Sequence, residues 1–166
     1  MKKGFTMIEL IFVIVILGIL ASVAVPRLAG TKADAEESAA VANLRTLISD
    51  ANTYYVATGD ISDATTWSEI TNVPLTSATS KANTAGASIK VGGKGCIDVQ
   101  FVPENATDKT PAHIKFTQNN DNKTKDVCKQ VLASESIKAY FASKVPNVTL
   151  NGEGAMPIGS NIKLER

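Results

Sequence analysis

Glu9 is the one ionisable residue in an otherwise apolar segment near the amino end of the chain. Between residues 5 and 25, only Thr6, Glu9 and Ser22 carry polar side chains. An ionised carboxylate in such a segment costs roughly 2.5 to 3.5 kcal/mol at the centre of a bilayer. Its presence therefore indicates a function for Glu9 and a partner that neutralises its charge.

Cys96 and Cys128 are the two cysteines of the chain. In an oxidising compartment, a pair with no third thiol is most simply joined as a disulfide. Such a bond closes a loop of about 33 residues and stabilises the fold by roughly 3 to 4 kcal/mol on the chain-entropy estimate. A metal site is not expected, because the spacing matches no zinc pattern and His113, the lone histidine, is better explained as a strand-face residue.

Catalytic motifs are absent from the sequence. It contains no H-E-x-x-H and no G-x-S-x-G, and the glycines of VGGKGC lack the spacing of a phosphate loop. The cluster NNDNKTKD, with Asp121 and Asp126, has oxygen atoms that could hold calcium, but it matches no EF-hand spacing. A solvated loop with Asp126 as a helix cap is favoured, and calcium binding is the open alternative. We expect no enzymatic activity, no cofactor and no metal.

Residues 5–25 have the length of a membrane-spanning helix. These 21 residues rise about 30 Å as a helix, which matches the thickness of a hydrocarbon core. Two lysines precede the segment, and cationic flanks stay in the cytoplasm, so the remainder of the chain should be translocated. A cleaved secretory signal is the alternative. Against it, the apolar core of residues 10–25 exceeds the usual length of about 7 to 15 residues, and Glu9 would have no role.

A helical pattern continues beyond the apolar segment to about residue 57. The stretch ADAEESAAVANLRTLISDANTYYVATG is rich in alanine and free of proline, and Gly59 is a fitting stop. Pro26 lacks an N–H group, so the helix should bend there. Apolar residues recur at spacings of three and four, which predicts one buried stripe: Val41, Leu44, Ile48, Ala51 and Tyr55.

The remaining residues, 58–166, should form a head that covers this stripe. In TTWSEI, Thr66 stands three residues before Glu69, a capping box that predicts a short helix with Trp67 turned inward. CIDVQFV and HIKFTQ alternate as half-buried strands do, VGGKGC predicts a tight turn, and NVTLNGEG indicates a strand into an Asn-Gly turn. DVCKQVLASESIKAYFAS has helical spacing. The predicted fold class is α+β, with a spine helix over 5–57 packed against a small antiparallel sheet.

The stretch KKGFTMIEL and the apolar helix after it resemble the amino terminus of type IV pilins and of the pseudopilins of type II secretion and DNA-uptake machines. The resemblance is specific up to about Gly30 and thin beyond it. It implies that a prepilin peptidase removes the leader, residues 1–4, by cutting between Gly4 and Phe5, and that the new amine of Phe5 is methylated. Many pilins also carry a disulfide in the carboxy-terminal region, and some secretion pseudopilins bind calcium there.

The resemblance also implies the partners and the location of the chain. The partners are copies of this chain or related pilins, the prepilin peptidase, an inner-membrane assembly platform and the membrane itself. The precursor should lie in the inner membrane with its head in the periplasm. After assembly, the subunit should be part of a periplasmic pseudopilus or an extracellular pilus.

This cleavage supplies Glu9 with a counter-charge. A cationic amine on Phe5 would lie at a helix amino terminus, where the helix dipole adds positive potential. In a stack of staggered helices, Glu9 of one subunit can meet the Phe5 amine of another. Apolar helices can pack at many axial offsets, but only one offset pairs these two buried charges, so the pair would select it. The alternative is that Glu9 reaches the headgroups near the helix end.

Two functions from different classes remain open. The net charge of +1 and the absence of any run of five basic residues exclude a nucleic-acid surface. The first function is a structural subunit of a pilus or pseudopilus. The second is a free periplasmic binding domain whose leader is discarded. The leader is common to pili, secretion pseudopili and DNA-uptake filaments, so the sequence does not choose among these machines.

Overall fold

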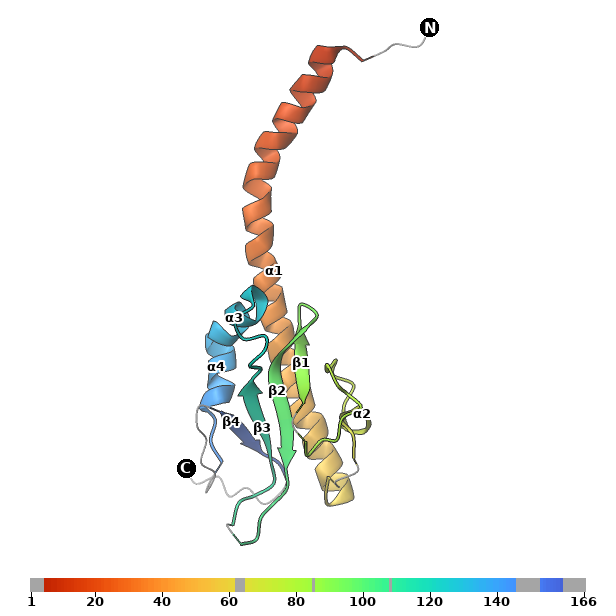
Figure 1. Cartoon of the computed structure of the whole chain (residues 1–166), viewed down its shortest axis with the longest axis vertical. Coiled ribbons are helices and arrows are strands. Elements are labelled where there is room, and N and C mark those ends of the chain that lie inside the picture. The colour runs from red at the N-terminus through yellow and green to blue at the C-terminus, as the bar shows by residue number, and fades with distance from the viewer. Residues whose placement is uncertain (1–4, 62–64, 85, 108, 146–152, 160–166) are drawn as a thin grey trace. The chain divides into compact units, whose positions relative to one another are not determined.

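The computed structural model of the chain (Figure 1) describes residues 5–61, 65–84, 86–107, 109–145 and 153–159. It divides into two compact units. The first ends at Ala35, and the second begins at Glu36. The predicted α+β class is confirmed: a long helix with an apolar first part is followed by a small four-stranded antiparallel sheet, which packs on the later part of that helix.

Helix α1 spans Met7–Thr58, close to the predicted range. It ends where a glycine can adopt a left-handed backbone, since Gly59 has a φ of 81° and donates its N–H to the carbonyl of Tyr55 at 2.8 Å. Pro26 lies inside the helix, which continues through it. The bend at Pro26 stays a prediction.

The buried stripe of α1 in the second unit is centred slightly off the predicted one. Leu44 and Ala51 are fully buried as expected. The other fully buried positions are Ala40 and Leu47, whereas Val41, Ile48 and Tyr55 lie half-buried at the margin. The buried residues therefore keep helical spacing. Two of them, Ala40 and Ala51, have small side chains that let the sheet approach the helix closely.

The sheet has the order β1-β2-β3-β4, and all its pairs are antiparallel. The strands are β1 (Ala87–Val91), β2 (Lys94–Val102), β3 (His113–Gln118) and β4 (Gly154–Pro157). The predicted strands at 96–102 and 113–118 are confirmed. The tight turn is confirmed too, because Gly92 and Gly93 join β1 to β2 with φ values of 56° and 80°.

Strand β1 was not predicted, and its burial explains why. It is buried on both faces except at Lys90, so it lacks the alternation that marks a half-buried strand. The polar Ser88 is buried within it because its hydroxyl donates to Asp98 of β2. The predicted strand at 147–150 and the turn after it lie outside the described residues, and β4 follows them.

The short helix α2 (Trp67–Ile70) forms as its capping box predicts. The backbone N–H of Thr66 donates to Glu69 Oε1 at 3.2 Å, and the Thr66 hydroxyl donates to the same oxygen at 2.7 Å. These bonds, the hydroxyl bond foremost, lower the pKa of Glu69. Trp67 is turned inward and fully buried, as expected.

The predicted helical stretch after residue 126 is two helices rather than one. These are α3 (Asp126–Ala133) and α4 (Glu135–Ala142). Ser134 separates them because its backbone is extended and its hydroxyl accepts the N–H of Ile137 at 3.3 Å, which caps α4. The prediction that Asp126 is a helix cap is wrong: Lys125 holds that position, and Asp126 is in the first turn, where a carboxylate suits the helix dipole.

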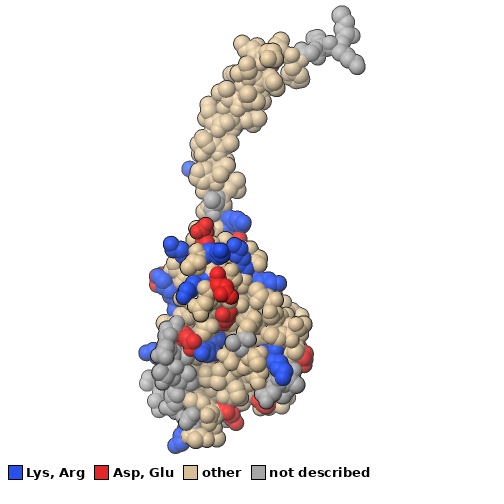
Figure 2. All heavy atoms as spheres, viewed as in Figure 1, with Lys and Arg blue, Asp and Glu red and all other residues tan. Residues whose placement is uncertain are grey.

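One core joins the sheet to the second part of α1. Its largest fully buried side chains include Trp67, Phe101 and Phe116. Tyr55 of α1 contacts Phe101 of β2, with ring centroids 6.2 Å apart. Charged side chains are spread over the surface of this unit in Figure 2, whereas the face of the first unit in the same view is almost free of them.

Candidate functional site

The candidate assembly site begins at Phe5 and Glu9, at the start of α1. Phe5 is 90% exposed, and Gly4 lies outside the described residues. Glu9 forms a reciprocal cap with Thr6. The backbone N–H and the hydroxyl of Thr6 donate to Glu9 Oε2 at 2.9 and 2.8 Å, and the N–H of Glu9 donates to the Thr6 hydroxyl at 3.3 Å.

This cap was not predicted, although the sequence contains its signal. Thr6 stands three residues before Glu9, the same spacing that predicted the cap at Thr66 and Glu69. Both donors from Thr6 bind Oε2. Glu9 therefore has a structural role at the helix terminus, and its Oε1 accepts no hydrogen bond from any described residue within the first unit.

The first part of α1 presents apolar side chains on all sides. Within the first unit, every large apolar side chain from Phe5 to Leu28 is between 40% and 90% exposed. The helix is long and apolar enough to cross a membrane, by its length and composition alone. A signal sequence meets the same criterion, so this observation does not separate the two alternatives for the segment.

The predicted bond between Cys96 and Cys128 is present. It joins the start of β2 to the first turns of α3 across a sequence separation of 32, with the two Cα atoms 5.3 Å apart. Both cysteines are fully buried. The bond therefore fastens α3 to the sheet from within the core.

We expect reduction of this bond to lower the melting temperature of the head. The chain-entropy estimate of roughly 3 to 4 kcal/mol corresponds to a decrease of about 10 °C for a unit of this size. Calorimetry of the exported protein with and without reductant measures the change. A Cys96→Ala/Cys128→Ala variant is the control, since its melting temperature should not respond to reductant. Reactive thiols in the native exported protein would contradict the assignment.

The described residues contain no group of three or more His, Cys, Asp or Glu that could hold a metal. His113 begins β3, as a strand-face residue should, and is buried with its Nδ1 2.8 Å from the carbonyl of Pro111. In the loop before α3, Asn119 Oδ1 accepts the N–H groups of Asp121 and Asn122 at 3.2 and 3.1 Å. This side chain amide therefore organises the loop that carries Asp121.

Both edges of the sheet are closed where the structure describes them. At β1, Ser88 exchanges hydrogen bonds with Thr76, and Lys90 donates to the carbonyl of Pro74. At β4, Ala155 donates to the carbonyl of Ser143, and Pro157 has no N–H group to offer. Strand addition at these described edges is thus disfavoured.

Comparison with known proteins identifies a motif at the amino-terminal site. The family model of the prokaryotic N-terminal methylation motif matches residues 1–25, which include Gly4, Phe5 and Glu9. The chain carries an N-terminal methylation motif. The match covers the same residues that carry the resemblance described from the sequence.

Curated relatives match part of this chain. The type II secretion system core protein G of Dickeya chrysanthemi is 45% identical over 53 residues, which are 32% of this chain and 35% of that protein. The protein of the same name from Aeromonas hydrophila is 51% identical over 43 residues, 26% of this chain and 30% of its own length. The matches thus span about a third of the curated relatives' length. No solved structure matches the chain.

Proposed function

We propose that this chain is a structural subunit of a type IV pilus or a type II secretion-like pseudopilus. One observation carries the proposal: the methylation motif is followed directly by an apolar helix whose side chains are exposed all round. Such a surface needs a bilayer before assembly and other subunits afterwards. The relatives' names favour the secretion pseudopilus.

Assembly would begin with cleavage between Gly4 and Phe5. The new amine of Phe5 would carry a positive charge, and Glu9 is the one acidic residue of the apolar segment. Because Thr6 binds only Glu9 Oε2, Oε1 can accept the Phe5 amine of a second subunit while the cap stays intact. The cap then holds the carboxylate in place for the pairing, which reduces the entropy lost on docking.

The second candidate function is a free periplasmic binding domain. It is compatible with the apolar helix, because a discarded signal sequence would pass the same length and composition criterion as a membrane helix. In that case, the mature chain would begin near Val25, and neither Phe5 nor Glu9 would remain in it.

Mass spectrometry of the mature amino terminus tests the proposal. We expect a chain that starts at Phe5 and carries one methyl group on its amine. A terminus near Val25 would instead establish the binding-domain alternative. Deletion of the gene, followed by assays of motility, secretion and DNA uptake, then identifies the machine.

A further inference from the structure

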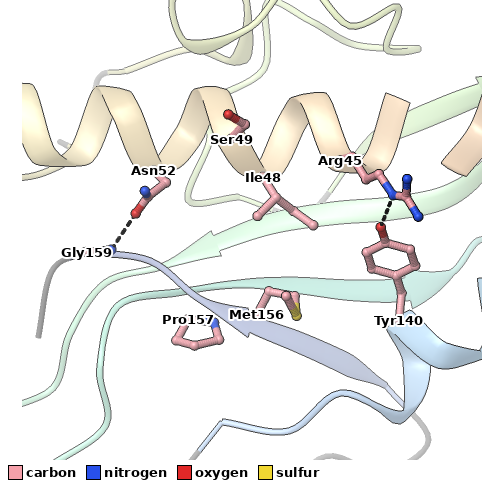
Figure 3. Close-up of a pocket in the computed structure, with 8 residues that line it drawn as sticks. All are labelled: Arg45, Ile48, Ser49, Asn52, Tyr140, Met156, Pro157 and Gly159. Atoms are coloured by element: carbon pink, nitrogen blue, oxygen red, sulfur yellow. Dashed lines mark hydrogen bonds between the residues drawn. The ribbon is translucent and has the colours of Figure 1, made fainter. Parts of the chain in front are cut away.

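A groove lies along α1 in the second unit, between this helix and the strand β4 (Figure 3). Its volume is about 380 Å³, within the range of sites that hold a few side chains. Four residues of α1 line one wall, and the other wall comes from α4 and the β4 region. The lining residues are Arg45, Ile48, Ser49, Asn52, Tyr140, Met156, Pro157 and Gly159.

The groove combines one cation with an apolar floor. Arg45 is exposed, and its Nε donates to the Tyr140 hydroxyl at 3.3 Å, which orients the guanidinium at one end of the groove (Figure 3). No carboxylate of the second unit's described residues pairs with Arg45. Ile48 and Met156 face each other across the floor. This lining fits a projecting segment that has an acidic residue beside small apolar ones.

Such a segment exists in the loop between β2 and β3, residues 103–112. The loop extends beyond the end of the sheet (Figure 1), and Pro103, Glu104 and Ala106 are exposed on it. Among its described residues, Asn105 and Thr110 exchange backbone hydrogen bonds of 2.9 and 3.1 Å, which join the two sides of the loop. A loop fixed in this way loses little conformational entropy when it docks.

Glu104 is not placed to fill the groove of its own chain. Phe101, three residues before Glu104, contacts Tyr55 near the end of α1, with ring centroids 6.2 Å apart. Tyr55 is about 15 Å farther along the helix axis than Arg45. Glu104 is exposed and the described residues show no ion pair for it, so its carboxylate is available to a second copy.

We propose that the groove binds the 103–112 loop of a second copy of this chain, with Glu104 paired to Arg45 and the loop's apolar residues on Ile48 and Met156. The contact joins two different surfaces, and in a filament it repeats from copy to copy in a head-to-tail manner. The net charge of +1 leaves little repulsion between copies. The inference rests on the proposed filament function, but it concerns the head and not the methylated terminus.

Disulfide trapping in cells that express the full chain tests this contact. The two native cysteines are bonded to each other, so a Ser49→Cys/Ala106→Cys variant adds the only free thiols. After mild oxidation, we expect a ladder of covalent multimers from the double variant and no ladder from either single variant. An oxidised monomer would mean that the loop reaches its own groove, and a covalent dimer without higher multimers would mean a reciprocal pair. Either result would overturn the proposal.

Charge reversal separates a specific pair from chance proximity. In the trapping background, Arg45→Glu or Glu104→Arg alone should lower the ladder yield about tenfold, and the two together should restore most of it. Lys129→Glu, an exposed reversal on α3 outside the groove, is the matched control and should leave the yield unchanged. Equal loss with Lys129→Glu, or no recovery in the double reversal, would refute the pairing.

The outcomes also separate this inference from the proposed function. Filaments without the ladder would overturn the head contact and leave the filament function in place. A ladder without filaments would support the contact and count against the filament function. If neither forms in cells where the chain is exported and folded, both are wrong.

Discussion

Glu9→Val is expected to abolish filament assembly while membrane insertion and leader cleavage continue. Valine removes the desolvation cost of a carboxylate from the apolar segment, so the precursor should insert at least as well as before. The amine of a neighbouring Phe5 would lose its counter-charge, and an unpaired buried charge is strongly unfavourable. Filaments recovered by shearing, together with the cleaved fraction in the membrane, measure the two effects.

Glu9→Gln is the matched control, because the cap that Glu9 forms with Thr6 and its proposed charge pairing can be separated. Glutamine can replace glutamate in a capping box, so the cap with Thr6 should survive while the charge is lost. If charge pairing drives assembly, both variants should fail. If Glu9→Gln assembles normally and Glu9→Val does not, the residue acts as a cap and the pairing mechanism is wrong.

Co-expression with the wild-type chain adds a second readout. A Glu9→Val subunit still offers its own Phe5 amine to a neighbour, so it keeps one half of the pairing. We expect it to enter mixed filaments at reduced frequency. Exclusive wild-type filaments would instead indicate that the variant fails before docking.

Gly4→Leu is expected to leave uncut precursor as the main species in the membrane. The peptidases of the resembling family require a small residue before the cut, and leucine would place a bulky side chain there. The precursor is four residues heavier and unmethylated, so mass spectrometry or electrophoresis distinguishes it from the mature chain.

Gly18→Leu is the control for this substitution. Gly18 lies inside α1 with open space where a side chain would be added, so leucine should be tolerated and cleavage should proceed. Normal cleavage in Gly4→Leu would show that the cut site is assigned wrongly. Loss of cleavage in both variants would point to insertion of the helix as the cause.

The sequence by itself determined the features that depend on contiguous residues. The long helix, its stop at Gly59, the cap at Thr66 and the strands at 96–102 and 113–118 all follow from local periodicity or from fixed spacings. The methylation motif also depends on contiguous residues, since the expected cut site and Glu9 lie within a few residues of each other. The cap between Thr6 and Glu9 was equally readable from its spacing.

Only the tertiary structure decided the features that join distant segments. Strand β1 is buried on both faces by the surrounding fold, so its own sequence shows no alternation. The helix break at Ser134 positions α4 over β4, where a Cβ on Gly154 would lie 2.1 Å from the carbonyl of Tyr140. The groove combines Arg45 with Tyr140 across a separation of 95 residues. Local patterns fix dihedral angles and exposed faces, whereas such pairings arise only when the core forms and brings these faces together.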